Sequence, residues 1–326
     1  MPAAPKQVQT AQVAMAGGAF TLGAVDDSWT GYLAAEGFLE PLLTELDGVE
    51  IEAVRERLVV ARGPARNVAW AANIWFDLRK LPITSSGDGA RRLRDIQRNW
   101  ALYATGHFRR AALLEEKLPP IKKRLHVFPA PQPTAPLGSW TLWEPELIYA
   151  SARCSSAFRH GEINFAEDRE GPPSRAYLKL WEALTRLGRH PLPGESCIDL
   201  GASPGGWTWV IAKLGAHAIA IDKAALDPAV AAMPGVEQRR ESAFGLAPET
   251  IGPVDWLFSD IICYPSRLLQ LIERWRTSGL ARNMVCTVKF QAETDHESAR
   301  AFAAIPGAQL FHLHHNKHEL TWALLA

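Results

Sequence analysis

A glycine-rich turn between an apolar strand and a helix limits the folds open to this chain more than any other feature. It is the run Cys-Ile-Asp-Leu-Gly-Ala-Ser-Pro-Gly-Gly-Trp-Thr at residues 197–208. Glycine adopts positive φ at little steric cost and lets main-chain N–H groups approach a ligand closely. The helix that begins near Trp207 adds its partly positive N-terminus at the same place. The run therefore predicts a ligand-binding turn at the carboxyl end of a strand.

An acidic residue follows at the spacing of a nucleotide-cofactor site. Asp222 ends the next apolar segment, where a carboxylate accepts hydrogen bonds from ribose hydroxyls. From Pro173 onward, apolar segments of strand length alternate with amphipathic segments of helical period. The sequence predicts strands at 196–200, 218–222, 236–240, 254–259, 283–289, 309–313 and 320–325, and helices at 176–187, 207–214, 266–277 and 292–305. This order predicts a Rossmann-like, seven-stranded α/β domain over residues 173–326.

The spacing of the glycines distinguishes between nucleotide cofactors. Gly-x-x-x-Gly-Gly differs from Gly-x-Gly-x-x-Gly, the pattern that cradles the pyrophosphate of NAD. Residues 199–207, Asp-Leu-Gly-Ala-Ser-Pro-Gly-Gly-Trp, resemble motif I of the FtsJ-like ribose 2′-O-methyltransferases, which depend on S-adenosyl-L-methionine. The resemblance implies that cofactor and a binding set of Asp199, Gly201, Ser203, Pro204, Gly205, Gly206, Trp207, Asp222, Ser242 and Asp260. For the adenine, Glu241, Ser242 and backbone groups alone remain alternatives.

Methyl transfer to a ribose hydroxyl requires a group that removes a proton from a weak acid. A lysine amine does this only when it is neutral, a state that a second cation favours while carboxylates orient both amines. The FtsJ-like pattern is matched by Ser-Arg-Ala-Tyr-Leu-Lys-Leu (174–180), Phe-Ser-Asp (258–260), Thr-Val-Lys (287–289) and His-Glu-Leu-Thr (318–321). The resemblance implies a catalytic tetrad of Lys179, Asp260, Lys289 and Glu319, with Lys289 as the general base.

Length and composition predict more than one domain. At 326 residues the chain exceeds the size at which a single core stops growing. We expect a disordered tail at 1–17, a smaller α+β domain at 18–125, a Pro-rich connector or docking arm at 126–172 and the methyltransferase domain at 173–326. In the smaller domain the pattern predicts a helix within 32–46 and a hairpin over 49–61, and leaves helix or strand open at 67–76.

The charge of the chain is unevenly distributed. Lys and Arg balance Asp and Glu at 35 each, yet residues 79–124 hold twelve basic and four acidic residues, a net charge of +8. A basic stripe on a neutral protein favours an RNA-binding surface, with a solvated helical face as the alternative.

Short motifs upstream resemble one branch of the FtsJ-like family, the RlmM-type enzymes that act on a cytidine of bacterial large-subunit rRNA. They are Glu-Lys-Leu-Pro (116–119), Val-Phe-Pro-Ala-Pro (127–131), Leu-Gly-Ser-Trp (137–140) and Cys-Ser-Ser (154–156). This resemblance implies 23S rRNA or a pre-ribosomal fragment as the partner. It also implies a THUMP-like RNA-binding domain at 18–125.

Other features limit the remaining interpretations. Four scattered cysteines and an N-terminus without signal-peptide character predict a cytoplasmic protein with reduced thiols. His312, His314, His315 and His318 lack a Cys or paired acid to complete a metal site, so we expect a turn near substrate phosphates, with Asn316 and Lys317 as donors. A non-catalytic RNA-binding protein of the same fold and a small-molecule methyltransferase are alternatives. The intact tetrad argues against the first, and the lysine pair with the basic leader against the second.

Overall fold

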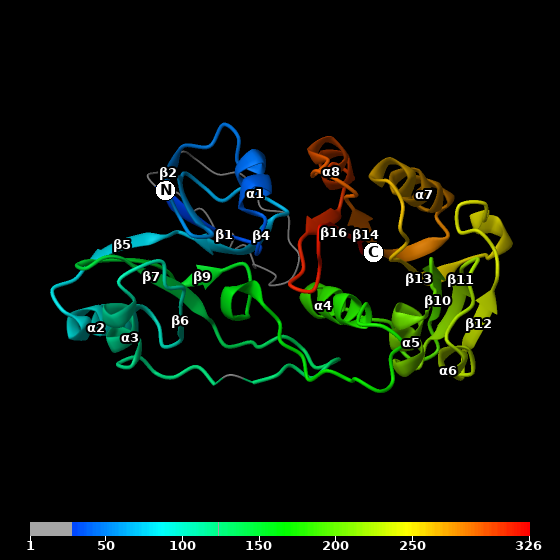
Figure 1. Cartoon of the computed structure of the whole chain (residues 1–326), viewed down its shortest axis with the longest axis horizontal. Coiled ribbons are helices and arrows are strands. Elements are labelled where there is room, and N and C mark those ends of the chain that lie inside the picture. Colours follow the sequence, from blue (N-terminus) through cyan, green and yellow to red (C-terminus); the bar gives the residue numbers. More distant parts are fainter. Residues whose placement is uncertain (1–27, 123) are drawn as a thin grey trace, which may run out of the picture.

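The computed structural model describes residues 28–122 and 124–326. An N-terminal and a C-terminal half lie side by side along the long axis, on the left and right of Figure 1. The tail expected at 1–17 and the first residues of the domain expected from residue 18 lie outside the described residues. Within those residues, no helix has the length and apolarity needed to cross a membrane.

The C-terminal half is built on a seven-stranded sheet of order β12-β11-β10-β13-β14-β16-β15. The strands from β12 to β14 run parallel, and β16 is antiparallel to both of its neighbours. Their bounds are β10 (Ser196–Leu200), β11 (His217–Ile221), β12 (Val236–Arg239), β13 (Val254–Ser259), β14 (Ala281–Lys289), β15 (Ala308–Phe311) and β16 (Glu319–Leu324). The predicted seven-stranded α/β domain is confirmed.

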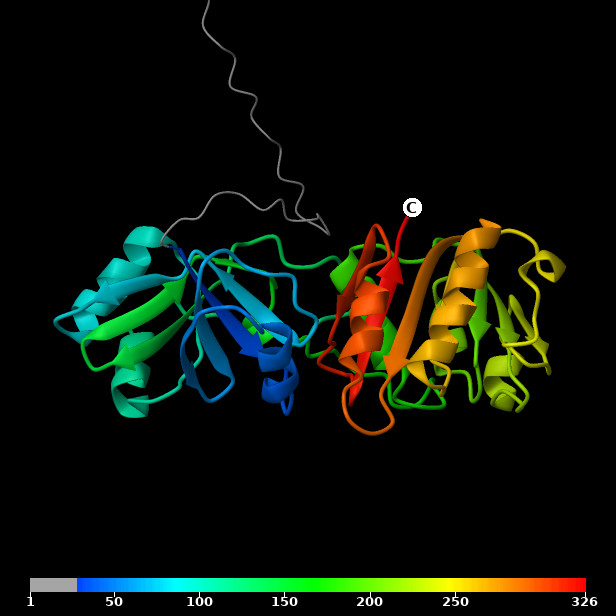
Figure 2. The ribbon, with the colours of Figure 1, turned by 90° about the horizontal axis from the view of Figure 1, so that it is seen from above.

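Helices cover both faces of this sheet, which explains why its central strands are largely apolar and buried. In Figure 1, α7 and α8 lie above the sheet, and α4, α5 and α6 lie below it; Figure 2 shows α7 and α8 from above. Their bounds are α4 (Tyr177–Leu187), α5 (Gly206–Lys213), α6 (Pro228–Ala231), α7 (Pro265–Ser278) and α8 (His296–Ala303), with a short 3-10 turn η2 (Pro248–Thr250) before β13. One core contains Trp181, Trp207 and Phe258, and the core on the other face contains Trp275 and Trp322.

The N-terminal half contains two sheets, of order β2-β3-β1-β4-β9 and β5-β8-β7-β6. Helices α2 and α3 pack on the second sheet around the buried indoles of Trp100 and Trp140. The bounds are β1 (Trp29–Ala34), α1 (Leu39–Glu45), β2 (Ile51–Arg55), β3 (Leu58–Arg62), β4 (Ala71–Phe76), β5 (Arg79–Pro82), α2 (Ser86–Ile96), β6 (Trp100–Leu102), α3 (Phe108–Glu115), β7 (Gly138–Glu144), β8 (Leu147–Ser151), β9 (Arg153–Cys154) and η1 (Arg159–Gly161). The hairpin expected at 49–61 is present as β2 and β3.

Two stretches differ from the sequence-based expectations. The single helix expected within 32–46 is a strand, β1, followed by a shorter helix, α1. In the range expected to form a connector, residues 138–154 are strands β7, β8 and β9, which pair with β6, β5 and β4. These strands complete both N-terminal sheets. Their partners β4, β5 and β6 are formed by residues far earlier in the chain.

The Pro-rich segment before β7 lies along α4. The ring of Phe128 stacks on the indole of Trp181, with ring centroids 5.2 Å apart. The Gln132 amide donates hydrogen bonds to the carbonyl oxygens of Thr185 and Arg186, at 2.7 and 3.0 Å. The segment thus satisfies carbonyl groups at the C-terminal end of α4 that have no partner within the helix.

A loop between β15 and β16, residues 312–318, joins the two halves. The N–H of His312 donates to the Ala69 carbonyl oxygen at 2.8 Å, and its own carbonyl accepts from the guanidinium of Arg186 at 2.5 Å. The fully buried carboxylate of Glu182 on α4 accepts from the N–H groups of His314 and His315, at 2.8 and 3.0 Å. The Nδ1 atom of His315 lies 2.7 Å from the same carboxylate.

We predict that Glu182→Ala destabilises the protein by about 3 kcal/mol, because it leaves the N–H groups of His314 and His315 without their acceptor and the Arg186 guanidinium without its nearby negative charge. Urea unfolding followed by tryptophan fluorescence measures this change. Glu273→Ala is the matched control: its carboxylate forms a surface pair with Arg276 and should cost less than about 1 kcal/mol. Equal losses in the two variants would contradict a structural role for Glu182.

Candidate active site

A pocket of about 310 Å³ opens beside the glycine turn. It lies at the carboxyl ends of the parallel strands, because residues at or just after the ends of β10, β11, β13 and β14 border it. Eight of the residues expected to bind the cofactor line it: Asp199, Gly201, Ser203, Pro204, Gly206, Trp207, Asp222 and Asp260. Gly205 and Ser242, both described in the structure, do not line it.

The space around two of the glycines excludes any side chain. Gly201 has a φ of +83°, and a Cβ atom there would lie 2.7 Å from Cβ of Ile261. Gly206 begins α5, and a Cβ atom there would lie 2.7 Å from Oγ of Ser174. The turn therefore requires glycine where β10 passes the segment after Asp260 and where α5 begins beside the segment that precedes α4.

The carboxylate of Asp222 closes the turn from the neighbouring strand. It accepts hydrogen bonds from the N–H groups of Ser203 and Ala224, at 3.1 and 2.9 Å. The hydroxyl of Ser203 donates to the Ala225 carbonyl oxygen at 2.8 Å. Asp222 thus fixes the shape of the turn and also borders the pocket.

Asp199 lies at the base of the pocket and is almost completely buried. It accepts a hydrogen bond of 2.7 Å from the Thr208 hydroxyl on α5. Burial raises the pKa of Asp199 to about 7, although the Thr208 hydrogen bond opposes this rise; the nearby charge of Asp260 adds to it. A substantial fraction of Asp199 is therefore protonated near neutral pH.

The structure brings the four residues of the expected tetrad together. Nζ of Lys179 lies 2.8 and 2.7 Å from the two carboxylate oxygens of Asp260 and 3.1 Å from Oε1 of Glu319. Nζ of Lys289 lies 3.0 Å from Oδ1 of Asp260 and donates to the Asp260 carbonyl oxygen at 2.6 Å. All four side chains are 10–17% exposed. Asp260 therefore bridges two largely buried ammonium groups.

The two lysines of this cluster have different environments. Burial alone would lower the pKa of Lys179, but the carboxylates of Asp260 and Glu319 outweigh it, and the pKa is raised. Lys179 is thus a stable cation at neutral pH. Lys289 lines the pocket, whereas Lys179 lies behind Asp260 and does not. Of the two amines, Lys289 is the one positioned to meet a ligand in the pocket.

Three of the four histidines near the C-terminus have hydrogen-bonding partners for their rings. Nε2 of His312 lies 3.0 Å from the Lys317 carbonyl oxygen, and the pKa of this ring is lowered to about 4 by burial. His315 contacts Glu182, and Nε2 of His318 lies 2.8 Å from the Thr294 hydroxyl. No group of three or more metal-binding side chains gathers anywhere in 28–122 or 124–326.

Sequence reasoning missed several residues that line the pocket: Ser174, Ala176, Ala202, Ile261 and Ile262. Ser174 and Ala176 belong to the heptapeptide that identified Lys179, so their proximity could have been inferred from that match. Ile261 and Ile262 directly follow Asp260, and Ile262 is 77% exposed. No periodic signal marks these residues, because the loop between β13 and α7 places them.

Part of the basic segment is neutralised by its own acidic residues. Arg91 pairs with Asp88 at 2.6 Å and with Asp95 at 3.1 Å, and Arg92 pairs with Asp88 at 3.1 Å. Arg98 and Arg109 are exposed, and their side chains have no ion pair or hydrogen bond to any described residue. The net charge of +8 already includes these acidic residues, so unpaired cations such as Arg98 and Arg109 account for the positive excess of the segment.

Comparisons with known proteins place the resemblance in the C-terminal half. Residues 172–297 match the FtsJ-like methyltransferase family. The protein named ribosomal RNA large subunit methyltransferase M from Halorhodospira halophila is 40% identical over 157 residues, which cover 46% of this chain and 46% of that protein. The protein of the same name from Methylococcus capsulatus is 37% identical over 129 residues, 38% of this chain and 36% of that protein. These matches confirm the resemblance to the FtsJ-like methyltransferases.

The chain spans less than half the length of the relatives that it matches. Among solved structures, TrmN from Thermus thermophilus aligns with 90% of this chain and 98% of its own, at 14% identity and a TM-score of 0.33.

We predict that the stability of the protein falls between about pH 4 and pH 7 through Asp199. The unfolded chain ionises this group above its ordinary pKa of 3.8, while the folded protein keeps it protonated up to about 7. Asp199→Asn cannot ionise, so the difference in unfolding free energy between variant and wild type should shift by about 4 kcal/mol in favour of the variant over this range, at about 1.36 kcal/mol for each pKa unit. Urea unfolding at several pH values measures it. Parallel pH profiles would show that Asp199 is already ionised in the folded protein.

Proposed function

We propose that this chain is an S-adenosyl-L-methionine-dependent methyltransferase that acts on the 2′-hydroxyl of a ribose in large-subunit rRNA. The observation that supports it most is the cluster of Lys179, Asp260, Lys289 and Glu319 beside the glycine-turn pocket. The match to the FtsJ-like methyltransferases and the names of the relatives support the reaction and the RNA.

The residues of the pocket suit the cofactor. Gly201 and Gly206 leave a cradle that Cβ atoms would fill, and Asp222 borders it with a carboxylate that can accept hydrogen bonds from ribose hydroxyls. Trp207 forms another part of the wall, fixed by its Nε1–H bond of 2.9 Å to the Ala176 carbonyl oxygen. Bound there, the cofactor would supply an activated methyl group on a sulfonium.

The proposed mechanism gives each member of the tetrad a separate task. Lys289 takes the proton of the ribose hydroxyl on its neutral Nζ, so that the oxygen becomes the nucleophile. Lys179 stays charged and holds Asp260, which in turn fixes the Lys289 amine by the contact of 3.0 Å. Glu319 completes the charge balance through Lys179. Positioning and proton removal are the contributions of the protein, since the methyl donor is already activated.

We further propose that the N-terminal half positions the RNA, as the THUMP-like domain predicted from the sequence would. Its exposed, unpaired cations are suited to phosphate contacts, which fix the register of an RNA without reading its sequence. The cytidine of 23S rRNA remains the specific target that the RlmM-type resemblance implies.

We predict that Lys289→Arg abolishes methyl transfer while RNA and cofactor still bind. Arginine keeps the positive charge but does not deprotonate near neutral pH, so it cannot accept the hydroxyl proton. Single-turnover transfer to rRNA fragments measures the rate, and calorimetry measures cofactor binding. Glu319→Gln is the comparison, expected to lose less activity because its contact acts through Lys179. Near wild-type turnover in Lys289→Arg would exclude Lys289 as the base. If the wild-type protein binds RNA but transfers no methyl group, the result would favour a non-catalytic RNA-binding protein.

We also predict that replacing Arg98 and Arg109 by Ala weakens RNA binding and lowers the slope of log K against log salt by about 1–2, because each phosphate contact contributes roughly 0.7–0.9 to that slope. Affinity measured at several salt concentrations tests this. Arg91→Ala should change the slope less, since Asp88 and Asp95 already neutralise that side chain. An unchanged slope for the double variant would make the basic segment a solvated face.

A further inference from the structure

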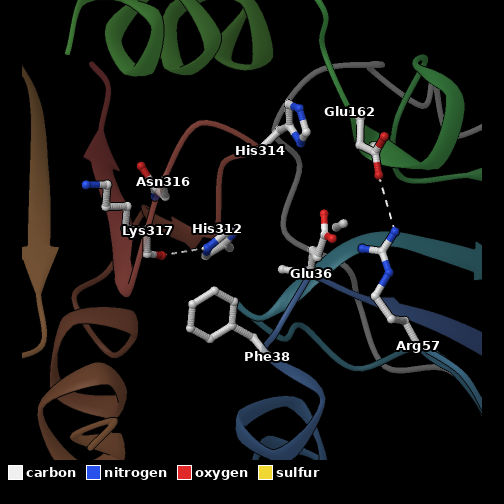
Figure 3. A pocket seen from close by; sticks show the side chains of 11 residues that line it. Glu36, Phe38, Arg57, Glu162, His312, His314, Asn316 and Lys317 are labelled. Carbon is white, nitrogen blue, oxygen red and sulfur yellow. Dashed lines mark hydrogen bonds and ion pairs between the residues drawn. The ribbon is translucent and has the colours of Figure 1, made fainter. Parts of the chain in front are cut away.

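A second pocket, of about 290 Å³, lies between the two halves of the chain (Figure 3). Its walls come from the turn after β1, from the turn between β2 and β3, from β4, from the end of η1, and from the 312–318 loop. The glycine turn contributes no residue to it. The two pockets are therefore separate, and the one between the halves is not the cofactor site proposed above.

Charged groups of both signs face this pocket. The guanidinium of Arg57 donates to Oε1 of Glu162 at 3.3 Å and to the Ala34 carbonyl oxygen at 3.0 Å. The side chains of Glu36, His314 and Lys317 are exposed and have no hydrogen bond or ion pair to any described residue. The cations Arg57 and Lys317 balance the carboxylates of Glu36 and Glu162. This balance argues against a phosphate site, which would need a positive excess.

An aromatic side chain forms another part of the wall. The ring of Phe38 stacks on the buried indole of Trp70, with centroids 4.6 Å apart, and lies 4.9 Å from the ring of His312. Figure 3 shows Phe38, Glu36, His314 and the Arg57–Glu162 pair arranged around the same space. Hydrogen-bond donors, acceptors and an aromatic surface in one small pocket are the features by which proteins recognise an unstacked nucleobase.

Two residues that line the pocket contact Glu319 of the tetrad. Lys317 is two residues from Glu319, so their Cα atoms lie within about 7 Å of each other. The N–H of Lys317 is 3.4 Å from Oε1 of Glu319, and the Asn316 amide donates to the Glu319 carbonyl oxygen at 3.1 Å. An RNA with one ribose at Lys289 therefore has its neighbouring nucleotides close to this pocket.

We propose that the pocket between the halves binds one unstacked base of the RNA, adjacent to the methylated nucleotide. The carboxylate of Glu36 accepts from an exocyclic amino group, and Lys317 and His314 donate to a ring carbonyl oxygen. Cytosine and guanine have both groups, whereas uracil lacks the amino group and adenine the carbonyl. The inference rests on the proposed function for the identity of the ligand, and it adds a determinant of which RNA sequence is methylated.

The test is the double variant Glu36→Ala/Lys317→Ala in the full chain, assayed on an rRNA fragment that the wild type methylates. We expect the KM for RNA to rise at least tenfold, since two hydrogen bonds to the base are lost, with kcat and cofactor affinity within about twofold of wild type. Glu40→Ala/Arg282→Ala is the matched control: it removes the same charges from exposed positions outside the pocket. An unchanged KM in Glu36→Ala/Lys317→Ala would overturn the proposal.

A second arm identifies the base. Each nucleotide flanking the methylated one is replaced in turn by an abasic residue, and we expect one position to raise the KM of the wild type but not that of the double variant. Equal sensitivity of both proteins at every position would overturn the inference.

RNA binding measured by fluorescence anisotropy keeps the test independent of turnover. If the wild type binds the fragment without methylating it, the proposed function fails. The loss of affinity in the double variant then still tests whether the pocket binds the RNA. Binding of free cytidine or guanosine in the pocket with unchanged RNA affinity would make it a small-molecule site and also overturn the inference.

Discussion

The carboxylate of Asp260 allows two lysine side chains to be buried at one point of this fold. An ammonium group loses much of its hydration on burial and is tolerated only beside a compensating charge. Asp260 contacts both Lys179 and Lys289, and Glu319 supplies a second carboxylate to Lys179. These residues come from a helix and from strands at the centre of the sheet. The four charges therefore compensate one another only when β13, β14 and β16 lie side by side in this order.

The register of the sheet fixes this arrangement. Lys289 and Glu319 are directly paired across β14 and β16, and Ser259, which precedes Asp260, is paired with Cys286 on β14. Glu319 directly follows the 312–318 loop, so the position of the loop also sets the position of this residue. Glu182 and Arg186 hold the loop against α4, the helix that supplies Lys179. The same loop contacts Ala69, so it connects the N-terminal half to the strand that begins with Glu319.

The C-terminal half could be predicted from sequence because its signals are local. Most strands of the parallel sheet are short apolar runs, and Asp260 and Lys289 lie at the ends of two neighbouring ones, so the topology brings these two residues together. The N-terminal half depends on pairings that no local pattern shows. Tyr32, Leu33 and Ala34 are all fully buried and form a strand inside a sheet, although the spacing of apolar residues over 32–46 also suits a helix. Strands β7 to β9 find their partners some 30 to 80 residues earlier, which composition alone cannot indicate.

The charge balance of the tetrad also suits the proposed reaction. With both lysines protonated, two cations face two carboxylates, and the site is neutral. A sulfonium bound in the adjacent pocket would add a positive charge and repel the ammonium form of the lysine nearest to it. Lys289 borders that pocket, whereas the contacts of Lys179 with Asp260 and Glu319 hold its proton. With Lys289 neutral, the tetrad would have a net charge of −1, which a sulfonium in the adjacent pocket would offset, and this charge balance suits the proposed reaction.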